Sequence, residues 1–382
     1  MQITSDFECG NIQICSLNGN FIKAKIKTDQ YSKDFQWFYF KIDGCKNAKL
    51  HIDIVNASEA SFPDGWYDYS ALASYDDAIW FRVDTTYDGK TLTIKFTPEC
   101  DKVYFAYFEP YKQKQHTCLV KRLKATPYFL GSYNGRSVEG RTIDVIRLGL
   151  QTSVIRKKIW MIARQHPGET MAEWFVEGIV DQIEANDEEI RRILNAADIY
   201  LIPNLNPDGS ALGSQRSNAA GINLNREWVA PSVERSPEIK YVKGLIEQTG
   251  IDLFLDVHGE ETLPYAFVMG CEGVPSYNAQ AAERERQFKN VLLKSNFDFQ
   301  DDYGYPKKKK GEADLTMASN YIGETYRCLS LTIEMPYKDC KNNLDPDKGW
   351  TVLRSKALSK SVILAIDEFI CLQGNSSQYQ SV

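Results

Sequence analysis

The pattern of apolar residues changes once along the chain, near residue 123, and this change constrains the fold more than any other feature. Before it, apolar and aromatic residues form short runs of β-strand character at 37–42, 79–83 and 91–96. The last run alternates with period two and follows Asp88-Gly89, a hairpin turn signal. Residues 1–122 are therefore predicted to form an antiparallel β-sandwich domain.

From residue 123 onward, short apolar strands alternate with amphipathic helices. The strand candidates are 159–163, 199–202, 251–257 and 329–333, and the helical patterns between them include 171–184 and 237–247. This alternation is typical of an α/β fold, a sheet with helices on both faces. We expect this second domain to cover 123–375, with a closing helix at about 350–372 and a polar tail at 376–382.

Composition excludes two classes of partner. The chain of 382 residues carries 45 basic and 51 acidic side chains, so it lacks the basic excess that binds nucleic acid. No run of about 18 or more apolar residues occurs, and the first residues lack the pattern of a signal peptide, so no membrane partner is expected. The nine cysteines are irregularly spaced and form no CxxC pair, which favours reduced thiols in the cytoplasm.

Polar residues cluster just after the predicted strands, where open α/β sheets place their ligands. His166 and Glu169 follow the strand 159–163 and are separated by Pro167 and Gly168, so a turn can point both side chains at one ion. A histidine and a glutamate at this spacing also fit an ordinary surface turn. The pair alone is therefore weak evidence for a metal site.

A second histidine strengthens the metal interpretation. His258 ends the apolar strand 251–257 and is followed by Gly259, which lets the backbone turn close to a ligand. A buried structural histidine is the alternative at this position. Together with His166 and Glu169 it gives two imidazoles and one carboxylate, the protein ligands of a catalytic zinc site with one open position. One Zn²⁺ per chain is predicted.

Hydrolysis at such a metal needs a general base and a group that stabilises the developing oxyanion. Glu334 ends the apolar strand 329–333, where a carboxylate without a partner is costly to bury, so it is the candidate base. Arg216, Asn225 and Arg226 lie between the two histidines in a stretch rich in glycine and asparagine. Arginine suits a carboxylate or an oxyanion, although each of these residues also fits a solvated loop.

Five ordered segments identify a resemblance. HPGET (166–170), NPDG (206–209), RSNAAGINLNREW (216–228), DVHG (256–259) and TIEMPYKD (332–339) resemble the M14 zinc carboxypeptidases, and within them the cytosolic carboxypeptidase subfamily with its N-terminal β-domain. The resemblance covers the whole chain. It implies a carboxypeptidase-like mixed sheet, and a peptide or protein C-terminus as the substrate.

The resemblance also implies a role for each candidate residue. The zinc ligands fall on His166, Glu169 and His258, and the general base on Glu334. The arginine that polarises the scissile carbonyl falls on Arg216, and the pair that holds the terminal carboxylate falls on Asn225 and Arg226. Zinc and Glu334 would then activate water, and zinc and Arg216 would stabilise the oxyanion.

Two positions depart from better-known relatives. Digestive members place a mobile tyrosine before the catalytic glutamate, and here Tyr305, Tyr321 and Tyr326 lie in that region with no motif to select one. The zinc histidine is followed by Gly259-Glu260-Glu261, where many relatives of the cytosolic subfamily have a second histidine. In this respect the chain resembles the bacterial branch of the subfamily.

The substrate has three open interpretations. The subfamily implies acidic C-terminal residues, and Lys307 to Lys310 could attract them, although such a run is more often a solvated loop. A zinc deacylase or amidase of N-acyl amino acids would use the same constellation, because its substrate also carries a free carboxylate. A peptide-binding module without activity is the third, and the presence of all the candidate catalytic residues argues against it.

Overall fold

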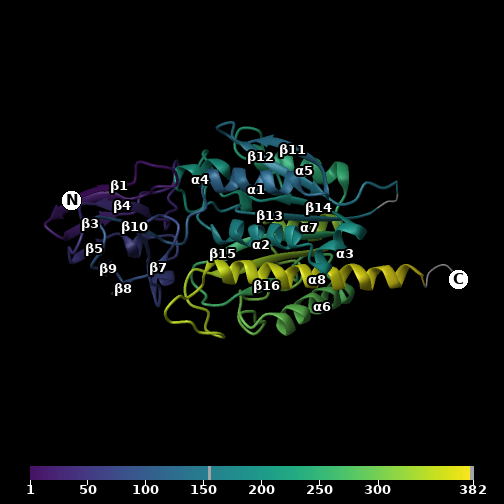
Figure 1. Cartoon of the computed structure of the whole chain (residues 1–382). Coiled ribbons are helices and arrows are strands. Elements are labelled where there is room, and N and C mark those ends of the chain that lie inside the picture. Colours follow the sequence, from purple (N-terminus) through teal and green to yellow (C-terminus); the bar gives the residue numbers. More distant parts are fainter. Residues whose placement is uncertain (154–155, 379–382) are drawn as a thin grey trace.

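The computed structural model of the protein describes residues 1–153 and 156–378. Two five-stranded β-sheets form its N-terminal part, which is drawn in purple in Figure 1. The first sheet has the order β1 (Gln2–Thr4), β4 (Tyr39–Asp43), β10 (Lys102–Ala106), β6 (Leu72–Ser74) and β7 (Phe81–Arg82). The second has the order β2 (Gln13–Asn18), β3 (Phe21–Lys25), β5 (Leu50–Ile54), β9 (Leu92–Phe96) and β8 (Asp84–Tyr87). Two short 3₁₀ helices, Ala57–Glu59 and Pro63–Trp66, follow β5.

The predicted sandwich is confirmed with several local differences. The period-two run at 91–96 forms β9, but the run at 37–42 becomes a strand only from Tyr39, and 79–83 contributes only the two residues of β7. Strands β3 and β5 pair in parallel, whereas the other strand pairs described in the two sheets are antiparallel. Helix α1 (Gln113–Ala125) runs across residue 122, the expected end of the domain.

A mixed seven-stranded sheet forms the second part of the protein. Its order is β11 (Phe129–Arg136), β12 (Thr142–Leu148), β14 (Ala197–Ile202), β13 (Lys157–Ala163), β15 (Leu253–Glu260), β17 (Leu329–Pro336) and β16 (Phe267–Met269). The four central strands β14, β13, β15 and β17 are parallel, and the outer strands are antiparallel to their neighbours. Every residue of β14, β15 and β17 is buried, as expected of strands covered on both faces.

Helices cover both faces of this sheet, as predicted. On one face, alternate residues of β13 such as Ile159 and Met161 share a core with α2 (Met171–Ala185), α3 (Glu188–Ala196) and α8 (Val352–Gln378). On the other face, Trp160 and Ile162 share a second core with α5 (Pro237–Thr249) and α7 (Ala318–Tyr326). The remaining helices are α4 (Pro207–Leu212), a 3₁₀ turn at Leu224–Arg226, and α6 (Ala279–Ser295).

The long closing helix is confirmed and extends further than expected. Helix α8 reaches Gln378, so it includes the first residues of the predicted tail, and 379–382 lie outside the described residues. In Figure 1 it runs in yellow along the α/β part, away from the N-terminal sheets. Within the described residues, no helix combines the length and the apolar character needed to cross a membrane.

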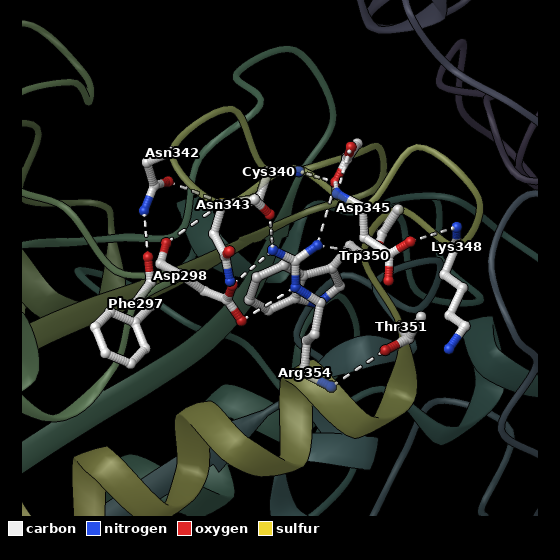
Figure 2. Close-up of polar contacts among 12 residues, drawn as sticks. Phe297, Asp298, Cys340, Asn342, Asn343, Asp345, Lys348, Trp350, Thr351 and Arg354 are labelled. Atoms are coloured by element: carbon white, nitrogen blue, oxygen red, sulfur yellow. Dashed lines mark hydrogen bonds and ion pairs between the residues drawn. The ribbon is translucent and has the colours of Figure 1, made fainter.

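Arg354, in the first turn of α8, anchors the segment that follows β17 (Figure 2). Its guanidinium donates to both carboxylate oxygens of Asp298, at 2.6 and 3.1 Å, and to Asp339 at 3.2 Å. The backbone carbonyls of Asn343 and Gly349 accept from the same group. These charge-assisted bonds hold the long connection between β17 and α8 against the body of the protein.

Candidate active site

Three neighbouring parallel strands deliver the predicted metal ligands and base to one edge of the sheet. His166 and Glu169 follow β13, His258 lies near the end of β15, and Glu334 near the end of β17. The register of β15 and β17 pairs His258 with Glu334. Because parallel strands end at the same edge of a sheet, residues more than 160 positions apart in the sequence meet here.

His166, Glu169 and His258 form a compact group of potential metal ligands. The Nδ1 atom of His166 lies 2.7 Å from one carboxylate oxygen of Glu169, and the Nδ1 atom of His258 lies 2.7 Å from the other. One ligand atom from each of the three residues lies within 4.8 Å of the others, and all three side chains are buried. Two imidazole nitrogens and a carboxylate are the donor set that catalytic zinc prefers.

Two further side chains orient the imidazole rings. Asn223 Oδ1 lies 3.0 Å from Nε2 of His166, at hydrogen-bonding distance and geometry, and Asp256 Oδ2 lies 2.9 Å from Nε2 of His258, at ion-pair distance but without hydrogen-bond geometry. A carbonyl or carboxylate oxygen at Nε2 favours the proton on that nitrogen, which leaves Nδ1 of each ring free to bind a metal. Gln165 in turn donates to Asp256 at 2.6 Å. The residues around the three ligands therefore also fit a zinc ion.

The electrostatic surroundings keep the first ring neutral. Burial, together with the nearby cation of Arg216, lowers the pKa of His166 to about 4. Its imidazole is therefore neutral at pH 7, which is the form that binds metals. Burial also acts to lower the pKa of His258, but Asp256 and Glu169 outweigh it and raise that pKa well above its ordinary value. The pKa of His258 is therefore shifted in the opposite direction to that of His166, because without a metal its imidazole lies beside the carboxylates of Asp256 and Glu169.

Arg164 stabilises the turn that carries His166 and Glu169 by a hydrogen bond to its backbone. This residue is buried and adopts a positive φ of 60°, and its Nε donates to the carbonyl of Pro167 at 3.1 Å. Its Nη1 donates to Glu173 at 2.8 Å and to the carbonyl of Tyr111 at 2.9 Å. No local sequence pattern signals this role, because the contacts depend on Tyr111, which precedes α1, and on Glu173 of α2.

Glu334 is buried beside the metal-ligand group and has an oxygen without a hydrogen bond. Its Oε2 atom has no partner, although the side chain is only 5% exposed. Burial raises the pKa of Glu334 well above its ordinary value, and the positive charge of His258 opposes this rise. A carboxylate in this condition is poised to exchange a proton with a molecule in the cavity.

Arg216, Asn225 and Arg226 lie in the loop between α4 and α5 and line the same cavity as the metal-ligand group. The side-chain oxygen of Asn225 accepts from the backbone N–H of Ala318 at 2.8 Å, so its NH₂ group is left to donate. Arg226 donates to the carbonyl of Asn225 at 2.7 Å and lies 3.6 Å from Asp314. The structure therefore brings all seven predicted site residues together around one cavity of about 750 Å³.

Of the three tyrosines considered from the sequence, Tyr305 reaches this cavity. It lines the wall and its hydroxyl donates to Glu260, whose second oxygen accepts from the backbone of Thr262 and Leu263. Tyr321 instead packs against Trp228 in the second core. Tyr326 also packs against that core. Lys307 and Lys308 line the cavity, whereas Lys309 and Lys310 do not.

Both parts of the chain match known families. A model of the cytosolic carboxypeptidase N-terminal domain matches residues 3–108, and a model of the zinc carboxypeptidases matches residues 126–349. The chain belongs to the M14 zinc carboxypeptidase family. It is accordingly a metallocarboxypeptidase, an enzyme with zinc as cofactor and a peptide C-terminus as substrate.

Individual relatives of this zinc carboxypeptidase cover most of its length. A solved metallo-carboxypeptidase from Pseudomonas aeruginosa is 42% identical, with a TM-score of 0.94 over 97% of this chain and 99% of that one. An uncharacterised protein of Zymomonas mobilis is 40% identical over 97% of each chain. Cytosolic carboxypeptidase 6 of Caenorhabditis elegans is 26% identical over 87% of this chain and 78% of its own length.

Proposed function

We propose that this enzyme removes the last residue of peptides or proteins that have a free C-terminal carboxylate. The roles we assign are zinc binding to His166, Glu169 and His258, general base to Glu334, oxyanion stabilisation to Arg216, and carboxylate binding to Asn225 and Arg226. The observation that carries the proposal is that all seven line one cavity, with one oxygen of Glu334 unpartnered.

In the proposed mechanism, each of the cavity residues has a role in one step of peptide hydrolysis. Zinc, when bound, acts as a Lewis acid toward the scissile carbonyl and makes water a stronger nucleophile. Glu334 takes the proton of the attacking water and later delivers it to the leaving amine. Arg216 donates hydrogen bonds to the oxygen that becomes negative. Asn225 and Arg226 bind the terminal carboxylate, which an internal peptide bond lacks, so the enzyme is an exopeptidase.

We also propose that acidic C-terminal residues are among the substrates. Lys307 and Lys308 line the cavity and add positive charge near bound peptides. Equal cleavage rates for peptides that end in Leu, Lys and Glu would contradict this proposal.

Mass spectrometry of matched peptides tests the function. Free-acid and C-terminally amidated peptides with varied last residues are incubated with zinc-loaded protein, and with Glu334→Gln as the inactive control. We expect loss of single residues from the free acids alone. Cleavage of small N-acyl amino acids without cleavage of tripeptides would instead indicate the deacylase, and no turnover of any substrate by zinc-loaded protein would indicate a binding module.

We propose a cytoplasmic location for the enzyme. It is supported by the relatives named cytosolic carboxypeptidases, and by nine cysteines that are all free, as is usual in a reducing compartment. Fractionation of source cells, with the protein detected by antibody, tests this proposal. Recovery from a secreted or periplasmic fraction would contradict it.

A further inference from the structure

The loop that carries Arg216 is bound by a carboxylate from the N-terminal sandwich. Asp29 Oδ1 accepts the backbone N–H of Gln215 at 2.7 Å, and Oδ2 accepts the N–H groups of Arg216 and Ser217, both at 2.8 Å. Asp29 is only 3% exposed. Three consecutive amides directed at one buried carboxylate are charge-assisted hydrogen bonds, stronger than ordinary backbone bonds.

A second residue of the sandwich contacts the side chain of Arg216. The guanidinium carbon of Arg216 lies 5.1 Å from the centre of the Phe62 ring, within the range of a cation–π contact. Phe62 also lines the cavity of about 750 Å³ together with Arg216 and Glu334. The backbone of the arginine is therefore held by Asp29, and its side chain rests on Phe62.

The chain before and after Arg216, from the end of α4 to Gly221, also contacts the N-terminal sandwich. Cys9 N–H donates to the carbonyl of Ala211 at 3.0 Å, and the Asn11 side chain donates to the carbonyl of Gly213 at 3.0 Å. Gly221 has a φ of +75°, and a Cβ atom there would lie 2.4 Å from the carbonyl oxygen of Tyr31. The sandwich thus contacts the chain on both sides of Arg216.

We propose that Asp29 and Phe62 are positioning residues for Arg216, so that the N-terminal domain is a functional part of the active site. Asp29 sets the position of the backbone at 215–217, and Phe62 aims the guanidinium at the scissile carbonyl. Displacement of such a group by about 1 Å can cost roughly a hundredfold in rate. This inference rests on the proposed function, because it assigns Arg216 to the reaction.

The position of Asp29 has an energetic cost that is consistent with this role. Burial raises the pKa of Asp29 to about 6, although the three N–H donors act to lower it. A buried carboxylate is tolerated when its hydrogen bonds offset the lost hydration. Asp88 offers a matched control, since it also accepts two consecutive backbone amides, of Lys90 and Thr91, but in an exposed hairpin of the sandwich.

Amide hydrogen exchange tests whether Asp29 restrains the backbone of residues 215–217, and the measurement needs no substrate. In metal-free protein, Asp29→Asn is expected to accelerate exchange of the amides of residues 215–217 at least tenfold, as measured by mass spectrometry. Asp88→Asn leaves these amides unchanged. Unchanged exchange at 215–217 in Asp29→Asn would overturn the proposal. This measurement tests the contact between Asp29 and residues 215–217 whether or not the protein cleaves any peptide.

A double-mutant cycle tests the catalytic part. With zinc content and melting temperature measured for each variant, Asp29→Asn should lower kcat on free-acid peptides ten- to a hundredfold, with less than a threefold change in KM. In the Arg216→Ala background the same change should cost less than twofold, because the group to be positioned is absent. Equal losses in both backgrounds would mean a general structural effect and would overturn the proposal.

Phe62→Leu provides a second variant if Asp29→Asn does not fold. Leucine keeps much of the volume of the ring but lacks its π face, so a loss of kcat is expected only where Arg216 is present. Full activity of Phe62→Leu, or a loss that persists in Arg216→Ala, would overturn the role of the ring. Wild-type protein that cleaves no peptide would refute the proposed function instead, and the exchange result would remain valid.

Discussion

His258 and Glu334 lie opposite one another on adjacent parallel strands, because β15 and β17 pair in the register that aligns them. The proposed metal ligand and the proposed general base are thus carried by fully buried strands rather than by loops. Rigid strands hold the distance between them more closely than loops would. The distance between the two side chains is therefore set by the pairing of β15 with β17. A substitution of either side chain is expected to leave this strand pairing in place.

The first prediction concerns Glu334→Gln. Glutamine keeps the shape of the side chain but cannot exchange a proton, so kcat should fall roughly 10²- to 10⁴-fold. The melting temperature should not fall, because the amide avoids the cost of a buried carboxylate. Peptide release assays and thermal unfolding measure the two effects. Glu283→Gln, on the exposed surface of α6, is the control and should keep full activity. Retained activity in Glu334→Gln would contradict its role as base.

The second prediction concerns Asp256→Asn. Asp256 lies 2.9 Å from Nε2 of His258, and loss of such a partner usually weakens metal binding about 10- to 100-fold. Competition with a chromophoric chelator measures the zinc dissociation constant. Asp252→Asn is a matched control, because Asp252 lies just before the same strand and pairs with exposed Lys157. Equal zinc affinities for the two variants would show that Asp256 does not support the metal site.

The third prediction concerns the binding of the terminal carboxylate. Arg226→Gln should raise KM for free-acid peptides roughly 10- to 100-fold, since a hydrogen-bonded charge pair is lost. The slow cleavage of amidated peptides, where it is measurable, should hardly change. Arg235→Gln removes a nearby arginine that pairs with Glu227 at the surface, and it should leave KM unaltered. An equal loss on free acids and amides would place Arg226 outside carboxylate recognition.

The sequence predicted those parts of the site that local patterns encode. His258 and Glu334 end apolar strands, and parallel strands must end at a common edge, so their proximity could be inferred from periodicity alone. Asp256 could have been found too. It stands two residues before His258 on a strand, and residues at this spacing share a face.

Other parts of the site depend on long-range packing that has no local signature. Asp29 meets Arg216 only when the sandwich docks on the loop, and the two residues are 187 positions apart. Tyr305 lies in a loop without regular structure, where its hydroxyl donates to Glu260. Such a loop has no periodic pattern of apolar residues, so the sequence could not distinguish Tyr305 from the other two candidate tyrosines. The parallel pairing of β3 with β5 likewise follows from the arrangement of whole strands, because alternation of apolar residues does not distinguish parallel from antiparallel neighbours.

The last prediction concerns His116, a residue of α1 that is buried against α2 and β12. Its Nδ1 lies 2.6 Å from Glu173 and its Nε2 lies 3.3 Å from Asp144, while Arg164 and Lys124 contact the same two carboxylates. Burial acts to lower the pKa of His116, but Glu173 and Asp144 outweigh it and raise the pKa from 6.5 to about 9. At about 1.4 kcal/mol per pKa unit, this corresponds to roughly 3 kcal/mol of stability.

The sign of the pH dependence follows from the direction of this shift. Because the folded protein binds the proton more tightly than the unfolded chain, the stabilisation is complete below pH 6.5 and is lost as the pH rises through about 9. Urea unfolding across this range should therefore show a steeper fall in stability for the wild type than for His116→Gln. His51→Gln, which removes a partly exposed histidine outside this buried network, is the control variant. Parallel curves for the wild type and His116→Gln would show that the buried network stabilises the protein without a proton on His116.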